Sequence, residues 1–334
     1  MFSKITEAQN EALREVENRI REEVEKLPPH VRLIAGYHLG WWDYDGQPVK
    51  HQSGGKRVRA LFTILSKRMV RSTGEVPLEA AVAVELVHEF SLLHDDVFDN
   101  DISRRGRPSA WSVFGMPDAV LAGNALLTLA LDIVPRGAAA EALSAAVQLL
   151  LEGQANDCAF TKRSDITVDE CREMAKMKTG ALLGAACSLG GLAGQASSNH
   201  LALLREFGER VGLAWQLVND LHDIWPPSMP TGKPERSDLA SRKRTLPIVA
   251  ALCADQSEAA ADLRRIYNSP QPTSTALLET ASQLVEAAGG RSWALVERDR
   301  ELSRAREILD LISPQDQTAD ISVWDLTLLI TRLH

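Results

Sequence analysis

The chain of 334 residues has few aromatic side chains, which make up 5% of the sequence with only 3 Tyr and 7 Phe. β-Sandwiches favour aromatic and β-branched residues, whereas the abundant Ala and Leu of this chain are good helix formers. Apolar residues make up 45% of the sequence, enough for a sizeable core. The composition therefore favours an all-α fold.

Acidic residues outnumber basic ones, because the chain has 37 Lys and Arg and 45 Asp and Glu. Its formal net charge is therefore −8. Nucleic-acid binding depends on cationic surface that releases counterions from phosphates, so this balance excludes a general nucleic-acid binder. The 4 cysteines are scattered without a CxxC pair or metal-ligand spacing. This usage is typical of reduced thiols in a cytoplasmic protein.

Long apolar runs are missing as well. The longest weakly polar stretch that we identify, 181–196, is rich in small residues and falls short of the roughly 20 apolar residues that span a bilayer. The charged N-terminal segment lacks the apolar core of a signal peptide. We therefore expect no stable insertion into a membrane and a cytoplasmic location.

Helical periodicity covers most of the chain. An amphipathic helix is expected over 5–27, with Glu17 to Lys26 on a solvated face, and a packed aromatic loop over 37–53. A helix is expected between Gly55 and Gly74, and others near 77–99, 117–133, 137–153, 167–195, 199–225, 244–268, 273–288, 291–312 and 323–333.

No βαβ alternation, fixed repeat or convincing linker interrupts these helices. We predict an all-α, single-domain helical bundle over 1–334. It would comprise an N-terminal helix and aromatic loop over 1–53, a motif-bearing core over 54–247 and C-terminal helices over 248–334.

Carboxylates gather near the end of the predicted helix 77–99. On an ideal helix Asp95 and Asp99 differ by roughly 40° and Asp96 lies within about 100°, so the three share one face. The residues before them are too apolar for a helix lying in water. Such carboxylates need a cation, and oxygen ligands without softer neighbours suit Mg²⁺.

A second acidic group lies far along the chain, between Gln216 and Asp223. Asn219 and Asp223 are four residues apart with Asp220 beside them, so one helical face again presents oxygen ligands. Two such groups on long apolar helices favour opposed walls of one site. Zinc is disfavoured, because His222 has no second His or Cys at zinc spacing.

Basic residues accompany these carboxylates. A glycine pair precedes Lys56 and Arg59, which are three apart and expected on one face of a helix start, where the dipole favours an anion. His88 lies seven residues before Asp95, on the same side of the helix. Further cations are Arg104, Arg105, Arg107, Lys178, Lys233, Lys243 and Arg244. Guanidinium groups bind phosphate oxygens in pairs, so the set predicts two polyphosphates bridged by metal.

Taken in order, these motifs resemble the trans-isoprenyl diphosphate synthases of the polyprenyl synthetase family, short-chain type. The family's DDxxD motif is similar to 95–99, its GGKxxR motif to 54–59 and its KT motif to 178–179. The second aspartate-rich region and its lysine are similar to Gln216, Asn219, Asp220, Asp223 and Lys233. The resemblance covers roughly 54–247, with Asn219 in place of a frequent aspartate.

The resemblance implies an all-α bundle around a deep cavity, usually a homodimer, with the two acidic regions facing each other. It implies condensation of isopentenyl diphosphate with an allylic diphosphate and release of pyrophosphate. The implied ligands of Mg²⁺, three ions per site with substrate bound, are Asp95, Asp96, Asp99, Asp220 and Asp223. The implied allylic-diphosphate contacts are Arg104, Lys178, Thr179, Gln216, Lys233 and Lys243, and the implied isopentenyl-diphosphate contacts are Lys56, Arg59, His88 and Arg105. The implied catalytic residues are Asp95, Asp96, Asp99, Lys178 and Asp220.

Product length is expected to depend on bulk below the first acidic group. Ser91 is small and about 40° from Asp95, whereas Phe90 is rotated by about 140°. By resemblance an aromatic at Phe90 is a cavity floor, although core packing is the other interpretation. With no two-residue insertion between Asp96 and Asp99, the pattern favours geranylgeranyl diphosphate over farnesyl diphosphate.

Two other classes of function stay open. A class I terpene cyclase would need no isopentenyl site, and Lys56, Arg59 and His88 argue against it. A non-catalytic partner subunit is disfavoured because Asp95 and Asp99 are intact.

Overall fold

The computed structural model describes residues 7–49, 55–71, 73–226, 236–269, 274–312 and 317–333, without the side chains of 317–321. The chain forms two compact units. Unit 1 comprises Met1–Val147, Leu182–Arg205 and Ile312–Val323, and unit 2 comprises Gln148–Ala181, Glu206–Leu311 and Trp324–His334. Because each unit combines segments far apart in sequence, no single boundary along the chain separates them. The prediction of one domain stays a prediction.

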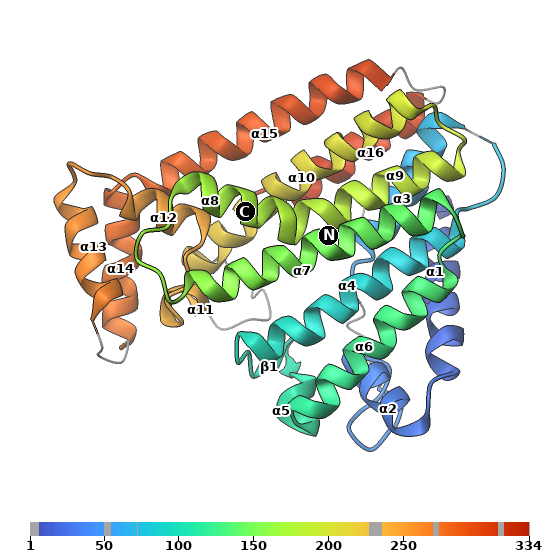
Figure 1. Cartoon of the computed structure of the whole chain (residues 1–334), viewed down its shortest axis with the longest axis horizontal. Helices are drawn as coiled ribbons and strands as arrows, with labels where there is room; N and C mark the ends of the chain where they lie inside the picture. The colour runs from blue at the N-terminus through green and yellow to red at the C-terminus, as the bar shows by residue number, and fades with distance from the viewer. Residues whose placement is uncertain are drawn as a thin grey trace. The chain divides into compact units, whose positions relative to one another are not determined.

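Unit 1 contains α1 (Glu7–Glu25), α2 (Pro29–His38), α3 (Val58–Val70), α4 (Leu78–Phe98), α5 (Ala110–Phe114) and α6 (Met116–Ile133), the start of α7 (Ala138–Phe160) and most of α9 (Ala181–Ala193). A short antiparallel hairpin of β1 (Ser103–Arg104) and β2 (Arg107–Pro108) follows α4 (Figure 1). Every residue from Ala80 to Val87 of α4 is buried. α4 packs along α6 and also contacts α3 and α1, so it forms the centre of this unit.

The start of α3 is set by Arg57, which adopts a left-handed conformation with φ of 49° directly before the first helical residue. The helix begins at Val58, so Lys56 precedes it. The prediction that Lys56 and Arg59 share one helix face is therefore wrong, because the left-handed residue between them breaks the helical spacing. The helix ends at Val70, before Gly74.

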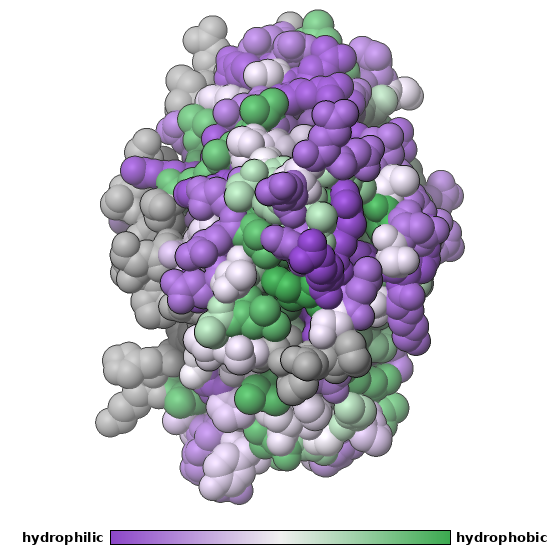
Figure 2. Space-filling model, turned by 90° about the vertical axis from the view of Figure 1, so that its left-hand side faces the viewer, coloured by the Kyte–Doolittle hydropathy of each residue, from purple (hydrophilic) through white to green (hydrophobic). Residues whose placement is uncertain are grey.

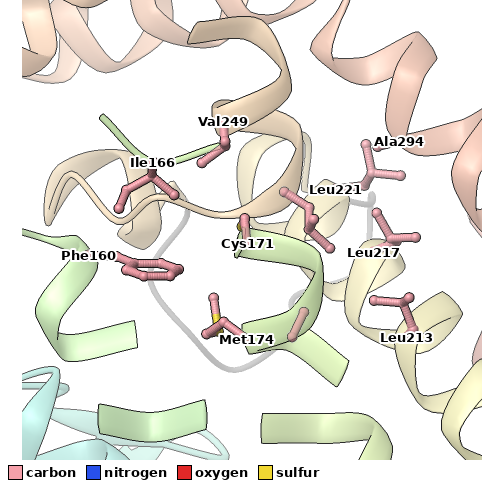
Figure 3. Close-up of a cluster of buried hydrophobic side chains, with 11 residues drawn as sticks. Phe160, Ile166, Cys171, Met174, Leu213, Leu217, Leu221, Val249 and Ala294 are labelled. Carbon is pink, nitrogen blue, oxygen red and sulfur yellow. The ribbon is translucent and has the colours of Figure 1, made fainter. Parts of the chain in front are cut away.

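Unit 2 contains α8 (Val168–Ala175), the π-helix η1 (Lys176–Gly180), most of α10 (Ser198–Ile224), α11 (Ser237–Ala240), α12 (Leu246–Leu252), α13 (Glu258–Asn268), α14 (Thr275–Ala287), most of α15 (Gly290–Ile312) and the end of α16 (Gln317–Ile330). A buried apolar cluster joins α7, α8, α10, α12 and α15 (Figure 3). Cys171 and Met174 of α8 lie there with Phe160, and Leu217 projects from α10. The same cluster fixes α8, from which η1 continues.

The all-α prediction is confirmed, and several predicted boundaries differ. Helix α2 was not predicted, although Pro29 occupies a first-turn position that tolerates proline. The predicted helix 167–195 is interrupted by η1. The predicted helix 244–268 is two helices, because Ser257 caps a new helix with its side chain.

The aromatic loop packs on unit 1, as predicted for the part that the structure describes. Trp41 is buried, and the indole N–H of Trp42 donates to the carbonyl of Leu33 at 2.8 Å. A Cβ on Gly36 would lie 1.9 Å from the Trp42 ring, so only glycine fits there. Tyr44 is exposed.

One described helix, α6, is long and apolar enough to cross a membrane by length and composition alone, and 28% of it is buried. A helix was predicted near 117–133, but its apolar character was not, since the longest weakly polar stretch that we identify from the sequence is 181–196. One side of α6 packs along α4, while most of the helix is not buried in this single chain. Figure 2 shows a different feature of the surface, a face on which hydrophilic side chains predominate and hydrophobic ones gather in patches between them.

Candidate active site

The first acidic group lies on the last turn of α4. Asp95 and Asp99 are partly exposed, whereas Asp96 is 1% exposed. Asp96 Oδ1 accepts hydrogen bonds from Nε of Arg104 at 2.9 Å and from Nη2 of the same guanidinium. Burial raises the pKa of Asp96, and the Arg104 contacts oppose that shift. Asp96 Oδ2 is buried without a hydrogen-bond partner, an oxygen that a cation could satisfy.

No group of three His, Cys, Asp or Glu side chains is arranged to hold a metal ion by itself within the described ranges. Asp96 is turned toward Arg104, which leaves Asp95 and Asp99 as the more accessible carboxylates of this acidic group. Mg²⁺ usually keeps several waters and is bound through one or two carboxylates and substrate phosphates. The oxygen donors of α4 therefore fit Mg²⁺ without a closed protein cage.

The β1–β2 hairpin carries the arginines that follow this acidic group. Its turn places both Arg105 (φ 53°) and Gly106 (φ 74°) in left-handed conformations. Arg105 Nη2 lies 3.0 Å from Oε1 of Glu89, so this arginine returns toward the middle of α4. Arg107 instead donates to the carbonyl of Trp42 and therefore holds the aromatic loop.

The predicted isopentenyl-diphosphate residues lie at the start of α3 and on α4. Arg59 is buried, and burial lowers the pKa of its guanidinium, whereas Glu85 and Glu89 raise it. Desolvation and then the neighbouring Arg59 hold the pKa of His88 well below its usual range, so the ring is neutral. Burial also lowers the pKa of Lys56. This end of unit 1 therefore combines the exposed Lys56 with the buried Arg59, two cations suited to binding an anion.

Sequence reasoning missed the acidic partners in this region. Arg57 Nη1 donates to Glu89 Oε1 at 2.7 Å, its Nε donates to Glu17 Oε2 at 2.8 Å, and Glu85 Oε2 lies 3.6 Å from Nη1. The prediction that Glu17 lies on a solvated face is therefore wrong, because a partner forty residues away engages its carboxylate. A signal existed for two of the partners, since Glu85 and Glu89 are four apart in an apolar helix.

Of the two residues predicted to set product length, Phe90 lies at the interface of α4 and α6. Phe90 is buried, with its ring centroid 4.6 Å from that of His94. A Cβ on Gly123 of α6 would lie 2.5 Å from the His94 ring and 3.5 Å from Phe90. The hydroxyl of Ser91 donates to the carbonyl of His88 at 2.7 Å. Phe90 is thus held against α6.

Unit 2 contains the second half of the predicted site. Lys178 Nζ donates to Asp157 Oδ2 at 2.7 Å. The neighbouring Thr179 donates its hydroxyl to Gln216 Oε1 at 2.7 Å, and Gln216 Nε2 donates to Asp220 Oδ1 at 2.6 Å. These contacts join η1 to α10, and π-helices occur frequently at functional sites. Asp157 on α7 was not predicted, because no local pattern distinguishes it.

The carboxyl group of Asp220 is buried. Its pKa lies well above its usual range, first because of desolvation and then because of the nearby Asp238, with a smaller contribution from Asp157. Hydrogen bonds from Gln216 and from the Leu246 N–H oppose this shift. A bound cation would favour the ionised form of such a carboxyl group.

Of the remaining predicted site residues, some have described contacts and others lie outside the described ranges. Asp223 Oδ2 accepts the Ser237 hydroxyl at 2.6 Å and Oδ1 accepts the Asp238 N–H at 2.9 Å, so both oxygens hold the start of α11. Its role as a metal ligand stays a prediction. The Lys243 N–H donates to the Asp238 carbonyl at 2.8 Å. Lys233 and Gly54 lie outside the described residues. That the acidic groups of the two units face each other also stays a prediction.

Known proteins are similar to this chain in sequence and in fold. The sequence model of the polyprenyl synthetase family matches residues 47–285. A (2E,6E)-farnesyl diphosphate synthase of Mycobacterium tuberculosis is 38% identical over 312 residues, which cover 90% of this chain and 86% of that protein. A geranylgeranyl diphosphate synthase of the same organism is 40% identical over 275 residues, covering 80% and 78%.

Solved structures agree with this assignment. A polyprenyl synthetase from Streptomyces coelicolor has a TM-score of 0.88 at 36% identity, covering 96% of this chain and 98% of that one. A geranylgeranyl pyrophosphate synthase from Corynebacterium glutamicum, complexed with calcium and isoprenyl diphosphate, has a TM-score of 0.79 at 27% identity, covering 98% and 97%.

The chain belongs to the polyprenyl synthetase family and has its all-α isoprenoid synthase fold. It is a prenyltransferase of isoprenoid biosynthesis, a short-chain trans-prenyl diphosphate synthase. The predictions of family, fold class and enzyme class are confirmed. Relatives named for farnesyl and for geranylgeranyl products are similarly close, so the comparisons leave the product between these two.

Proposed function

We propose that the enzyme joins isopentenyl diphosphate to an allylic diphosphate and that geranylgeranyl diphosphate is its main product. The observation that carries the condensation is the group of cations at the start of α3, where Arg59 and Arg105 lie near the neutral His88 and Lys56 follows Gly55, which lies against Arg105. A terpene cyclase has no need of such a second anion site. The relative from Corynebacterium glutamicum that is complexed with isoprenyl diphosphate supports this proposal.

In the proposed reaction, the C–O bond of the allylic diphosphate breaks and pyrophosphate leaves with the electron pair. The double bond of isopentenyl diphosphate forms the new C–C bond to the allylic carbon, and a proton is then lost to pyrophosphate. The charge of the leaving group grows as the bond breaks, so preorganised cations stabilise the transition state more than the substrate. Isopentenyl diphosphate would be held by Lys56, Arg59, His88 and Arg105.

The allylic diphosphate would be held by Arg104, Lys178, Thr179, Gln216 and Lys243, with Lys233. We propose Mg²⁺ as the cofactor, three ions in the loaded site, bound by Asp95, Asp96, Asp99, Asp220 and Asp223. When bound, Mg²⁺ would neutralise charge on the leaving pyrophosphate. The calcium complex of the Corynebacterium glutamicum relative supports a divalent ion.

The choice of geranylgeranyl diphosphate depends on the side chains before Asp95. Phe90 is packed against His94 and α6, whereas the small Ser91 is four residues from Asp95 and half-buried. A chain growing along the face of Asp95 would therefore meet Ser91 before an aromatic ring. Farnesyl diphosphate is the alternative product, expected if Phe90 stops the chain after fifteen carbons.

We also propose that the enzyme is a homodimer. Met116, Leu121 and Leu131 of α6 are large exposed apolar side chains in this single chain. A second copy would cover them and would account for the low burial of α6. Sedimentation equilibrium tests this proposal, with Leu121→Asp expected to give a monomer. Vesicle flotation distinguishes a membrane as the alternative partner, and the cytoplasmic location stays a prediction.

The function is tested by incubating the purified protein with Mg²⁺, isopentenyl diphosphate and, in turn, dimethylallyl, geranyl and farnesyl diphosphates. Products are extracted and sized before and after phosphatase treatment. We expect a twenty-carbon prenyl alcohol only after phosphatase. A fifteen-carbon alcohol would instead give farnesyl diphosphate as the product. A hydrocarbon released without phosphatase and without isopentenyl diphosphate would make the enzyme a cyclase.

A further inference from the structure

Glu89 lies at the centre of a buried group of charges in unit 1. Its side chain is 1% exposed. Oε1 accepts hydrogen bonds from Arg57 at 2.7 Å and from Arg105 Nη2 at 3.0 Å, and Oε2 lies 3.1 Å from the same Nη2. His38 Nε2 from α2 lies 3.0 Å from Oε2. One carboxylate thus contacts groups from α2, the start of α3 and the β1–β2 hairpin.

These contacts keep Glu89 ionised. Burial by itself raises the pKa of its carboxyl group, but Arg105, His38 and Arg57 hold that pKa well below its usual range. A buried carboxylate is costly unless it is paired and hydrogen-bonded. The negative charge therefore persists only because the neighbouring cations compensate it.

Gly55 lies directly against this pair. A Cβ on Gly55 would lie 2.9 Å from Arg105 Nη2 and 3.2 Å from Glu89 Oε1. Absence of a side chain at Gly55 allows the backbone before Lys56 to pass close to the arginine. Glu89 therefore holds Arg105 at a fixed place beside the segment that carries Lys56.

A negative charge among anion-binding groups has an electrostatic cost. Coulomb's law alone predicts that neutralising Glu89 would strengthen the binding of a diphosphate. The ordering of Arg105 predicts the opposite, weaker binding of the diphosphate. An arginine that loses its partner must be ordered again when the ligand binds. The Coulomb effect and the ordering effect change the affinity for the diphosphate in opposite directions, so one substitution at Glu89 separates them.

We propose that Glu89 is a positioning residue that fixes Arg105, and through Arg57 the start of α3, for binding the diphosphate of isopentenyl diphosphate. The inference rests on the proposed function. Glu89 is not itself a ligand of the substrate, since it carries the same sign of charge. Its contacts to two arginines on separate segments make it the residue that sets their spacing.

The test is calorimetric titration of isopentenyl diphosphate into the full chain without divalent metal, for the wild type and Glu89→Gln. We expect the variant to bind roughly tenfold more weakly, as for loss of a hydrogen bond to a charged group. KM for isopentenyl diphosphate should rise by a similar factor, with KM for the allylic diphosphate unchanged. Equal or tighter binding by Glu89→Gln would overturn the proposal.

Glu23→Gln is the matched control. Glu23 is also buried and accepts two contacts at 2.8 Å, from Arg19 and Lys26, but it contacts none of the predicted substrate residues. It should lower the melting temperature without changing the affinity for isopentenyl diphosphate. An equal loss of affinity in the control would show a nonspecific packing effect and overturn the positioning role.

Arg105→Lys gives a second route if Glu89→Gln does not fold. It keeps the positive charge but cannot reproduce the guanidinium contact with both carboxylate oxygens. Binding of isopentenyl diphosphate should weaken by a similar factor, and unchanged binding would overturn the proposal. If the wild type binds no isopentenyl diphosphate, the proposed function is overturned as well. If Glu89→Gln and Arg105→Lys both catalyse condensation normally, only the positioning role is overturned.

Discussion

Lys178 and Asp157 form an ion pair between η1 and α7, with Nζ donating to Oδ2 at 2.7 Å. Gly153 lies one turn before Asp157, and a Cβ there would approach the Lys178 backbone nitrogen to 2.5 Å. α7 therefore approaches η1 closely enough for a short acidic side chain to reach the ammonium group. The pair fixes the direction of a lysine that we assign to the allylic diphosphate.

Asp157→Asn should weaken the orientation of Lys178 while keeping the shape of the side chain. Hydrogen bonds to charged groups contribute about 1.5–3 kcal/mol, so we expect KM for the allylic diphosphate to rise by roughly tenfold or more. Steady-state kinetics with varied allylic substrate measures the effect. Asp165→Asn, which removes an exposed carboxylate paired with Arg163, is the control and should leave KM unchanged. A normal KM in Asp157→Asn would contradict the assignment.

Gly123→Ala should disturb the interface of α4 and α6. The new methyl group would lie 2.5 Å from the His94 ring, so this ring must move against Phe90, with which it is in edge contact. Overpacking of this kind typically costs about 1–3 kcal/mol of stability. We expect a lower melting temperature and an altered ratio of fifteen- to twenty-carbon products.

The exposed Asn124 offers a control on the same helix. Asn124→Ala should change neither the melting temperature nor the product ratio. If Gly123→Ala lowers stability but leaves the product ratio unaltered, Phe90 does not limit the chain length.

The stability of the fold should decrease at alkaline pH. Burial raises the pKa of the Cys187 thiol to about 12, and burial also raises the pKa of Cys171 and Tyr267. In the unfolded chain these groups lose protons at their ordinary pKa values, 9.0 for the thiols and 10.0 for the phenol. The unfolded state then binds fewer protons than the folded state, so the free energy of unfolding falls as pH rises from about 9 toward 12.

Each buried group contributes a slope of up to about 1.4 kcal/mol per pH unit in this range. Cys187→Ala removes one such group, so its free energy of unfolding should fall less steeply between pH 9 and 11. Chemical denaturation at several pH values measures both slopes. Parallel curves for the two proteins would show that the Cys187 thiol ionises equally in both states.

Removal of divalent metal should abolish condensation without unfolding the protein. No closed metal cage exists among the described residues, so we expect chelation to change the melting temperature by less than about two degrees. Mg²⁺ with inorganic pyrophosphate should instead raise it, because a ligand at 100 times its Kd stabilises the folded state by about 2.7 kcal/mol. Differential scanning fluorimetry distinguishes these results, and unfolding by chelator alone would indicate a structural metal.

The sequence predicted the long helices, because α4 and α10 have sustained apolar patterns, and the motifs at their ends named the candidate site residues. It did not predict the tertiary pairs of those motifs. Asp157 and Lys178 are separated by 21 residues, and Glu17 and Arg57 by 40. Helical periodicity describes which face of one helix is apolar, but it does not identify which distant side chain meets it.

Local backbone changes were missed for a different reason. The left-handed Arg57 and the π-helix η1 both depart from regular α-helix, and non-glycine residues at positive φ have no strong sequence signal. These two changes decide where Lys56 and Lys178 lie. The residues of the candidate site stay a prediction from the motifs, and their placement in the structure did not follow from the sequence.

Glu17 and His38 also bear on where the functional chain begins. The family match starts at residue 47, but Arg57 and Glu89 of the matched segment contact these two residues before it. A protein trimmed to the limits of the match would expose a buried arginine and a buried glutamate with fewer compensating charges. We therefore expect such a trimmed protein to be less stable, because the contacts that hold the start of α3 extend back to the turn of α1 that carries Glu17.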